Sequence, residues 1–130
     1  MISILIAEDL ELLREDMAEL LNAQPDMQVV GTASTGAKIL ELAKNVKSDV
    51  VLMDIEMESL SAGIMAAEAI RDAGIDTRVV YLTAHETEKT ILTAMATGAA
   101  DYIVKGCPDA ELLERAEKQG VTLLGSEMDE

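Results

Sequence analysis

A chain of 130 residues, 49% hydrophobic and 27% charged, is long enough for one domain with a buried core and too apolar to remain disordered. Its formal net charge of −15 would repel a phosphate backbone, so we expect no direct binding of nucleic acid by this segment. Residues 1–7 are too few to span a bilayer, and the single cysteine, Cys107, cannot form an intrachain disulfide. We therefore expect a cytoplasmic protein that does not enter a membrane.

Short apolar runs of strand length recur along the chain, at residues 2–7, 27–32, 50–54, 79–82 and 101–104. Most are apolar at successive positions, which is typical of parallel strands covered by helices on both faces. The run at 27–32 is weaker, as expected of an edge strand. Stretches with apolar residues three or four apart follow these runs and predict five helices. The first two carry Leu10, Leu13, Met17, Leu20 and Leu21, then Ile39, Ala43 and Val46, and the other three cover about residues 61–73, 86–97 and 108–118.

This strict alternation predicts an α/β fold of the flavodoxin-like type, a doubly wound five-stranded parallel sheet of order 2-1-3-4-5 with five helices. Gly98 is expected to cap the fourth helix at its C-terminus. We predict a single domain over residues 1–118. Residues 119–130 are then a short acidic C-terminal tail or a truncated linker.

Three carboxylates are predicted to meet at one edge of this sheet. Glu8 and Asp9 follow the first strand, and Asp54 ends the third. In a sheet of this order the ligand crevice lies outside the carboxyl ends of those two strands. Acids gathered there need a cation, and Mg²⁺ prefers such oxygen ligands. For Glu8 and Asp9, a favourable position at a helix N-terminus explains the acids equally well.

Two further side chains follow the strands on the same rim. Lys105 comes after the fifth strand and could reach a phosphoryl group, with Asp54 as the attacking nucleophile. Thr83 follows the fourth strand and offers a hydroxyl. Taken alone, Lys105 is better explained as a solvated loop lysine and Thr83 as a helix cap. Their common position at strand ends favours a shared site.

The sequence resembles the receiver domains of two-component response regulators, from residue 2 to about residue 118. The matching pieces are Glu8-Asp9, Met53-Asp54-Ile55-Glu56-Met57, Thr83-Ala84, Gly98-Ala99 before Asp101-Tyr102, and Lys105. Residues 24–31 and 48–54 are most similar to the NarL/FixJ class, many of whose members regulate transcription.

The resemblance implies a phosphorylation switch rather than an enzyme. Asp54 would accept a phosphoryl group from a sensor histidine kinase, and Thr83 and Lys105 would bind the phosphoryl oxygens. Glu8, Asp9, Asp54 and the backbone carbonyl of Glu56 would surround Mg²⁺.

The resemblance also implies how phosphorylation at the site would change another surface of the domain. Thr83 and Tyr102 would move together as the switch, while Glu56 and His85 would tune a slow self-dephosphorylation. Partners would include a downstream effector domain or protein, with a homodimer formed on phosphorylation. An effector domain that regulates transcription would lie outside this chain.

The chain departs from the family in two loops. The usual Met-Pro-x-x-x-Gly after the phosphoacceptor is replaced by residues 57–63, Met-Glu-Ser-Leu-Ser-Ala-Gly, without the proline and with the glycine one residue late. The family motif therefore does not predict the path of the loop after Asp54. Gly106 replaces the frequent proline after Lys105, so we do not expect the usual cis peptide there.

Two other functions share features with this pattern. A phosphohydrolase with an aspartate nucleophile would also use an α/β sheet and Mg²⁺, but it needs a cap over the site for which the chain leaves no room. The input half of a DNA-binding regulator fits as well, with a DNA-binding part outside these residues.

Overall fold

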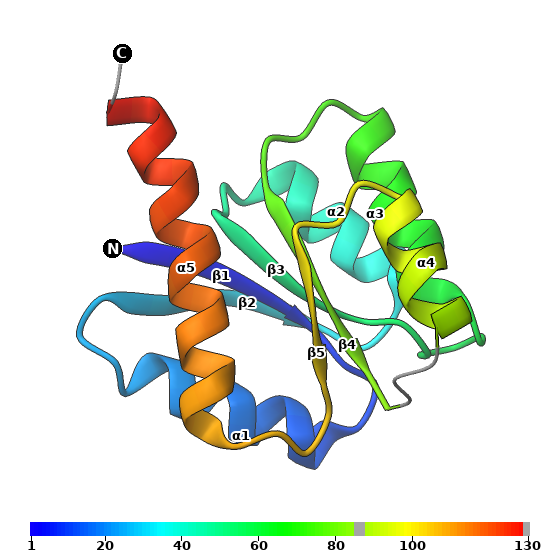
Figure 1. The fold of residues 1–130 in the computed structure, drawn as a ribbon, viewed down its shortest axis with the longest axis horizontal. Helices are drawn as coiled ribbons and strands as arrows, with labels where there is room; N and C mark the ends of the chain where they lie inside the picture. The colour runs from blue at the N-terminus through cyan, green and yellow to red at the C-terminus, as the bar shows by residue number, and fades with distance from the viewer. Residues whose placement is uncertain (85–87, 129–130) are drawn as a thin grey trace.

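The computed structural model describes residues 1–84 and 88–128, with side chains described for residues 1–84 and 92–120. Strands and helices alternate along the chain, and Figure 1 shows the sheet between two layers of helices. The elements are β1 (Ile2–Ala7), α1 (Glu11–Asn22), β2 (Met27–Ala33), α2 (Gly36–Asn45), β3 (Val50–Asp54), α3 (Ala62–Asp72), β4 (Arg78–Thr83), α4 (Glu88–Ala96), β5 (Asp101–Val104) and α5 (Asp109–Met128).

All neighbouring strands of the sheet are parallel, and their order is β2-β1-β3-β4-β5. The predicted flavodoxin-like fold is confirmed. Each expected strand is present to within one residue at either end. Because the strands are parallel, their carboxyl ends share one edge of the sheet, which is where the sequence analysis expected the site.

Two hydrophobic cores lie on opposite faces of the sheet, as the runs of consecutive apolar residues predicted. One core joins strand side chains such as Ile4 and Leu52 to Met17 and Leu21 of α1 and to Leu112 of α5. The other packs α2, α3 and α4 against the opposite face. Full burial of one such side chain contributes about 1.5–3 kcal/mol, so these cores supply most of the stabilisation.

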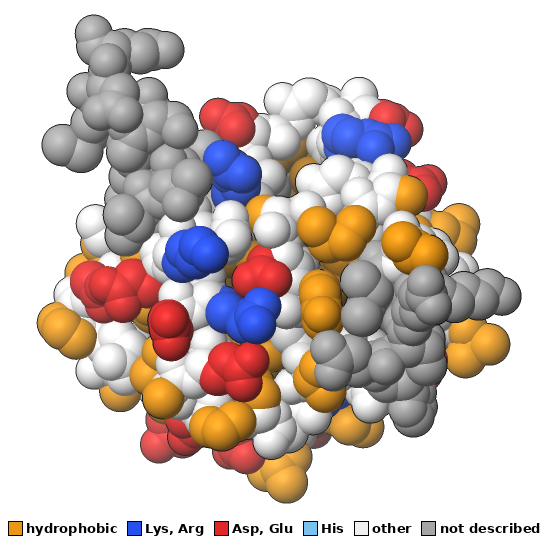
Figure 2. Space-filling model, viewed as in Figure 1, with side chains coloured by type: hydrophobic (Ala, Val, Ile, Leu, Met, Phe, Trp, Pro, Cys, Tyr) orange, Lys and Arg blue, Asp and Glu red, His pale blue; other side chains and the backbone are white. Residues whose placement is uncertain are grey.

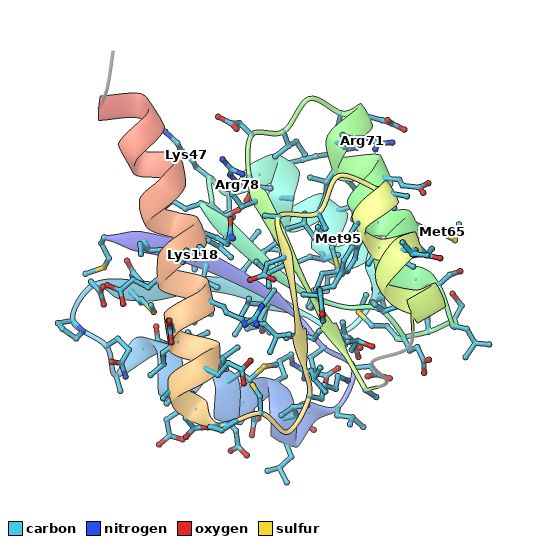
Figure 3. All side chains as sticks on the ribbon, in the orientation of Figure 1. Lys47, Met65, Arg71, Arg78, Met95 and Lys118 are labelled. Carbon is cyan, nitrogen blue, oxygen red and sulfur yellow. The ribbon has the colours of Figure 1, made fainter. Side chains whose placement is uncertain are left out.

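Helix α4 is anchored at its C-terminal end by polar contacts. Arg71 of α3, labelled in Figure 3, donates to the carbonyl of Thr97 at 3.0 Å, and the buried hydroxyl of Tyr81 lies 2.8 Å from the Thr97 hydroxyl. Gly98 has a φ of 84°, which confirms its predicted role as the helix cap. Residues 86 and 87, included in the predicted helix, lie outside the described residues.

Helix α5 is longer than the sequence predicted. We expected it to end near Lys118, and this end is wrong because the backbone stays helical to Met128. Gly120 is buried, and a Cβ added to it would lie 2.5 Å from Cγ2 of Ile2. The glycine therefore lets α5 cross closely over the start of β1. This long-range packing outweighs the low helix propensity of glycine.

Candidate functional site

The three predicted carboxylates do converge at the carboxyl edge of the sheet. Glu8 and Asp9 follow β1, Asp54 ends β3, and one oxygen from each lies within 4.8 Å of the others. Glu8 and Asp54 are buried, whereas Asp9 is exposed. Burying two acids side by side is unfavourable unless a cation compensates their charge.

Lys105 supplies part of that compensation. Its Nζ lies 2.8 Å from Oε1 of Glu8 and 3.0 Å from Oδ2 of Asp54, so the ammonium bridges two strands. It also donates a hydrogen bond to Oε2 of Glu8 at 3.2 Å. The Lys105 side chain is only 20% exposed, so its ammonium lies in a partly buried cluster with the two acids, and Lys105 is not the solvated loop lysine of the alternative interpretation.

The electrostatics of the site follow from this burial. Burial first, and then hydrogen bonding with Glu8, raise the pKa of Asp54 to about 8, although Lys105 opposes the change. Burial alone would lower the pKa of Lys105, but its contacts with Glu8 and Asp54 outweigh it and raise that pKa. Without another cation, Asp54 therefore tends to hold a proton at neutral pH.

The donor atoms suit a hard divalent cation. Oε1 of Glu8 and Oδ2 of Asp54 are buried and accept no hydrogen bond of good geometry, although both are within 3.0 Å of Lys105 Nζ. Buried oxygens of this kind are uncommon and usually have a further partner. With the exposed carboxylate of Asp9 beside them, they form an all-oxygen ligand set of the type that Mg²⁺ accepts.

The site opens to solvent through a cleft of about 660 Å³ that Asp9, Asp54, Thr83 and Lys105 help to line. Thr83 is buried at the end of β4, and its carbonyl accepts the Lys105 N–H at 2.7 Å. The backbone therefore ties the threonine and the lysine together. An acidic nucleophile, a cation-binding acid pair, a hydroxyl and an ammonium in one open cleft can bind and transfer a phosphoryl group.

Comparison with known proteins agrees with this geometry. The family model of the response regulator receiver domain matches residues 4–117. The chain belongs to this family.

Relatives and solved structures place this receiver domain near NarL-type transcription regulators, as predicted. The transcriptional regulatory protein YxjL of Bacillus subtilis is 40% identical over 121 residues, which are 92% of this chain and 55% of YxjL. The oxygen regulatory protein NreC of Staphylococcus aureus is 36% identical over 110 residues, 85% of this chain and 51% of NreC. The chain thus spans about half the length of the curated relatives it matches.

Among solved structures, the signal receiver domain of NarL from Mycobacterium tuberculosis superposes with a TM-score of 0.87 at 29% identity, covering 92% of this chain and 95% of that one. The response regulator domain of CheB from Thermotoga maritima gives a TM-score of 0.82 at 32% identity, over 92% and 96% of the two chains. Within the described residues of this receiver domain, no helix is long and apolar enough to cross a membrane.

The loop between β3 and α3, which the sequence left open, is held close to Asp54. The N–H of Gly63 donates to the carbonyl of Ile55 at 2.9 Å, and a Cβ added to Gly63 would lie 2.0 Å from the Asp54 carbonyl oxygen. Only glycine fits there. The N–H of Glu56 donates to Oδ1 of Asp54 at 3.3 Å, while the Glu56 side chain is exposed.

Tyr102 is half-buried on β5 and packs on the core beneath α4. Its N–H donates to Oδ1 of Asp101 at 2.8 Å, and its carbonyl accepts from Arg115 at 3.1 Å. Arg115 also pairs with Asp101 at 2.7 Å, and Figure 2 shows acidic and basic side chains side by side over β5 and α5. Asp101 and Arg115 therefore provide hydrogen-bond partners for the backbone N–H and carbonyl of Tyr102.

Two functional features escaped the sequence analysis. Gly63 was noted only as a displaced glycine, and Glu58 only as a missing proline, yet Gly63 packs on the Asp54 carbonyl and Glu58 accepts a hydrogen bond from the N–H of Gly36. The absence of a cis peptide at Gly106 was expected, and the described residues contain none; Gly106 has a φ of 87°. His85, a predicted tuning residue, lies outside the described residues.

Proposed function

We propose that this receiver domain accepts a phosphoryl group on Asp54 from a sensor histidine kinase in a Mg²⁺-dependent phosphorelay. The observation that carries the proposal is the buried Asp54 carboxylate, in contact with Lys105 and next to Glu8, at the base of an open cleft. Receiver domains of the family act as phosphoacceptor switches, and the relatives that this chain matches over about half their length are named as regulators.

Glu8, Asp9, Asp54 and the backbone carbonyl of Glu56 would hold Mg²⁺. When bound, the ion neutralises charge on the phosphoryl oxygens during transfer. A carboxylate oxygen of Asp54 attacks the phosphorus of the kinase phosphohistidine. The phosphorus–nitrogen bond breaks, and its electron pair stays on the imidazole. The product is an acyl phosphate on Asp54.

Lys105 and Thr83 then bind the new group. The Lys105 ammonium, which contacts the two carboxylates before transfer, donates to a phosphoryl oxygen afterwards, and the Thr83 hydroxyl donates to another. Since Thr83 ends β4 and Lys105 follows β5, their new contacts favour one arrangement of the β4–β5 side over another. Tyr102 would reorient with Thr83, and the exposed Leu92 and Met95 of α4 lie on the surface that changes.

The rest of the function follows from this switch. We propose that the phosphoacceptor unit includes α5 at least as far as Gly120, which packs on Ile2. We further propose that the switch acts on an effector domain or protein that regulates transcription and lies outside these residues. Slow self-dephosphorylation, tuned by Glu56 and His85, would reset the switch, and phosphorylation would favour a homodimer.

Intact mass spectrometry after incubation with acetyl phosphate and Mg²⁺ tests the acceptor. The parent protein should gain one phosphoryl group and Asp54→Asn none. Asp76→Asn is the matched control, because Asp76 is an exposed acid in the loop before β4, at the opposite edge of the sheet. A phosphoryl group on Asp54→Asn at the parent rate would refute the assignment.

A further inference from the structure

Glu58 occupies the position where receiver domains usually have proline, and its side chain reaches a different helix. Both carboxylate oxygens lie close to the N–H of Gly36, Oε1 at 3.0 Å and Oε2 at 2.9 Å. We propose that Glu58 is a positioning residue, which holds the loop after Asp54 in its metal-binding path by anchoring it to α2. This inference rests on the proposed function, because the metal belongs to that function.

The contact is favourable for both partners. Gly36 is the first residue of α2, so its N–H has no acceptor within the helix. The local cap, Thr35, accepts from Lys38 at 3.2 Å and leaves this donor unmet. A carboxylate at a helix N-terminus also interacts favourably with the helix dipole. Glu58 therefore supplies, from a distant loop, the acceptor that α2 lacks.

Glu58 can reach the start of α2 because Gly36, which has no side chain, lets α2 pack closely against α3. A Cβ on Gly36 would lie 3.1 Å from the carbonyl oxygen of Ala62 and 3.5 Å from Cβ of Ala66. The first turns of α2 and α3 are thus packed against each other. The loop from β3 to α3 is pinned at Gly63 on one side and at Glu58 on the other.

The restrained segment includes the proposed main-chain ligand. Glu56 is two residues before Glu58, and a carbonyl can be aimed at a metal only through the backbone that carries it. Its own N–H makes a long hydrogen bond of 3.3 Å to Asp54, which is a weak restraint. In other receiver domains a proline restrains this stretch through its fixed φ. Glutamate does not fix φ in this way. In this chain the contact between the Glu58 carboxylate and the Gly36 N–H restrains the loop instead.

A pair of variants separates positioning from simple helix capping. Glu58→Ala and Thr35→Ala each remove one acceptor from the N-terminus of α2, but only the first releases the loop. Mg²⁺ binding to the unphosphorylated protein is measured by NMR titration, with urea unfolding of the metal-free proteins alongside. We expect about ten-fold weaker Mg²⁺ binding in Glu58→Ala, as for other residues that orient metal ligands, and parent-like binding in Thr35→Ala.

Glu58→Gln distinguishes the anchor from a direct charge effect, because glutamine keeps an acceptor oxygen but no charge. Parent-like Mg²⁺ affinity in this variant supports positioning. Equal weakening in the Gln and Ala variants would instead make Glu58 a ligand or a charge partner of the ion. Hydrogen exchange at the Gly36 amide should be faster in Glu58→Ala even without metal.

The outcomes also separate this inference from the proposed function. If the parent binds Mg²⁺ and Asp54→Asn binds it more weakly, but Glu58→Ala matches the parent, only the positioning role is overturned. Equally weakened Mg²⁺ binding in Thr35→Ala and Glu58→Ala would show that Glu58 acts only as a helix cap. If the parent does not bind Mg²⁺ at all, both proposals fail together.

Discussion

Two loops on the same rim of the sheet are built in opposite ways. The loop after β3 needs Gly63 for space, since a Cβ there would meet the Asp54 carbonyl oxygen at 2.0 Å. The loop after β5 needs Gly106 only for its φ of 87°, and a Cβ there would have no atom within 4 Å. The first loop is packed and anchored, whereas the second is open.

The difference assigns distinct tasks to the two sides of the site. Asp54 and the loop that follows it form the fixed side, which presents the nucleophile in a constant place. Lys105 is tied to β4 through one backbone hydrogen bond to Thr83, and a Cβ on Gly106, the next residue, would have no atom within 4 Å. A new phosphoryl group can therefore move the Lys105 side without repacking the core.

The first prediction compares the two glycines directly. Gly63→Ala should cost about 3 kcal/mol of unfolding free energy, because backbone must shift to admit the methyl group. Gly106→Ala should cost only about 1 kcal/mol, the penalty of a left-handed conformation. Urea unfolding of both variants measures this. Equal losses would show that the two loops are not packed differently.

The strands and the site residues at their ends could be predicted from the sequence, but the packing of the loop after Asp54 could not. Runs of consecutive apolar residues gave the strands, and polar residues at their ends, such as Asp54 and Lys105, gave the site. Gly63 and Glu58 act through contacts with atoms of other elements, and no local pattern encodes such contacts. The end of α5 was missed for the same reason, because Gly120 owes its place to Ile2.

A second prediction concerns pH and the buried charge on the fixed side. Folding raises the pKa of Asp54 from 3.8 to about 8. The folded state then keeps a proton that the unfolded state has lost, so the stability due to Asp54 is complete below about pH 4 and is lost as pH rises towards 8.

Urea unfolding in a chelator between pH 5 and 9 tests this, with Asp54→Asn as the reference that cannot titrate. The parent should lose stability relative to the variant by at most about 1.4 kcal/mol per pH unit up to pH 8, and no further above it. Parallel profiles for the two proteins would contradict the raised pKa.

The smallest effects are expected in the output. Beryllofluoride with Mg²⁺ stands in for the phosphoryl group on Asp54. It should change hydrogen exchange more in α4, β5 and α5 than in α2 and α3. The Gly36 amide is left out of this comparison because it donates to Glu58 in the loop after Asp54. Thr83→Ala or Lys105→Ala should abolish the change. Changes confined to α2 and α3, or persisting in both variants, would show that the signal takes another route.

The most direct test of the account is to locate the phosphoryl group itself. Borohydride reduces an aspartyl phosphate to homoserine, so the protein is treated with acetyl phosphate and Mg²⁺, reduced, digested and sequenced by tandem mass spectrometry. We predict homoserine at position 54 alone. Homoserine at Asp9, or a reduced product at Glu8 or Glu56, would contradict the claim that Asp54 is the acceptor.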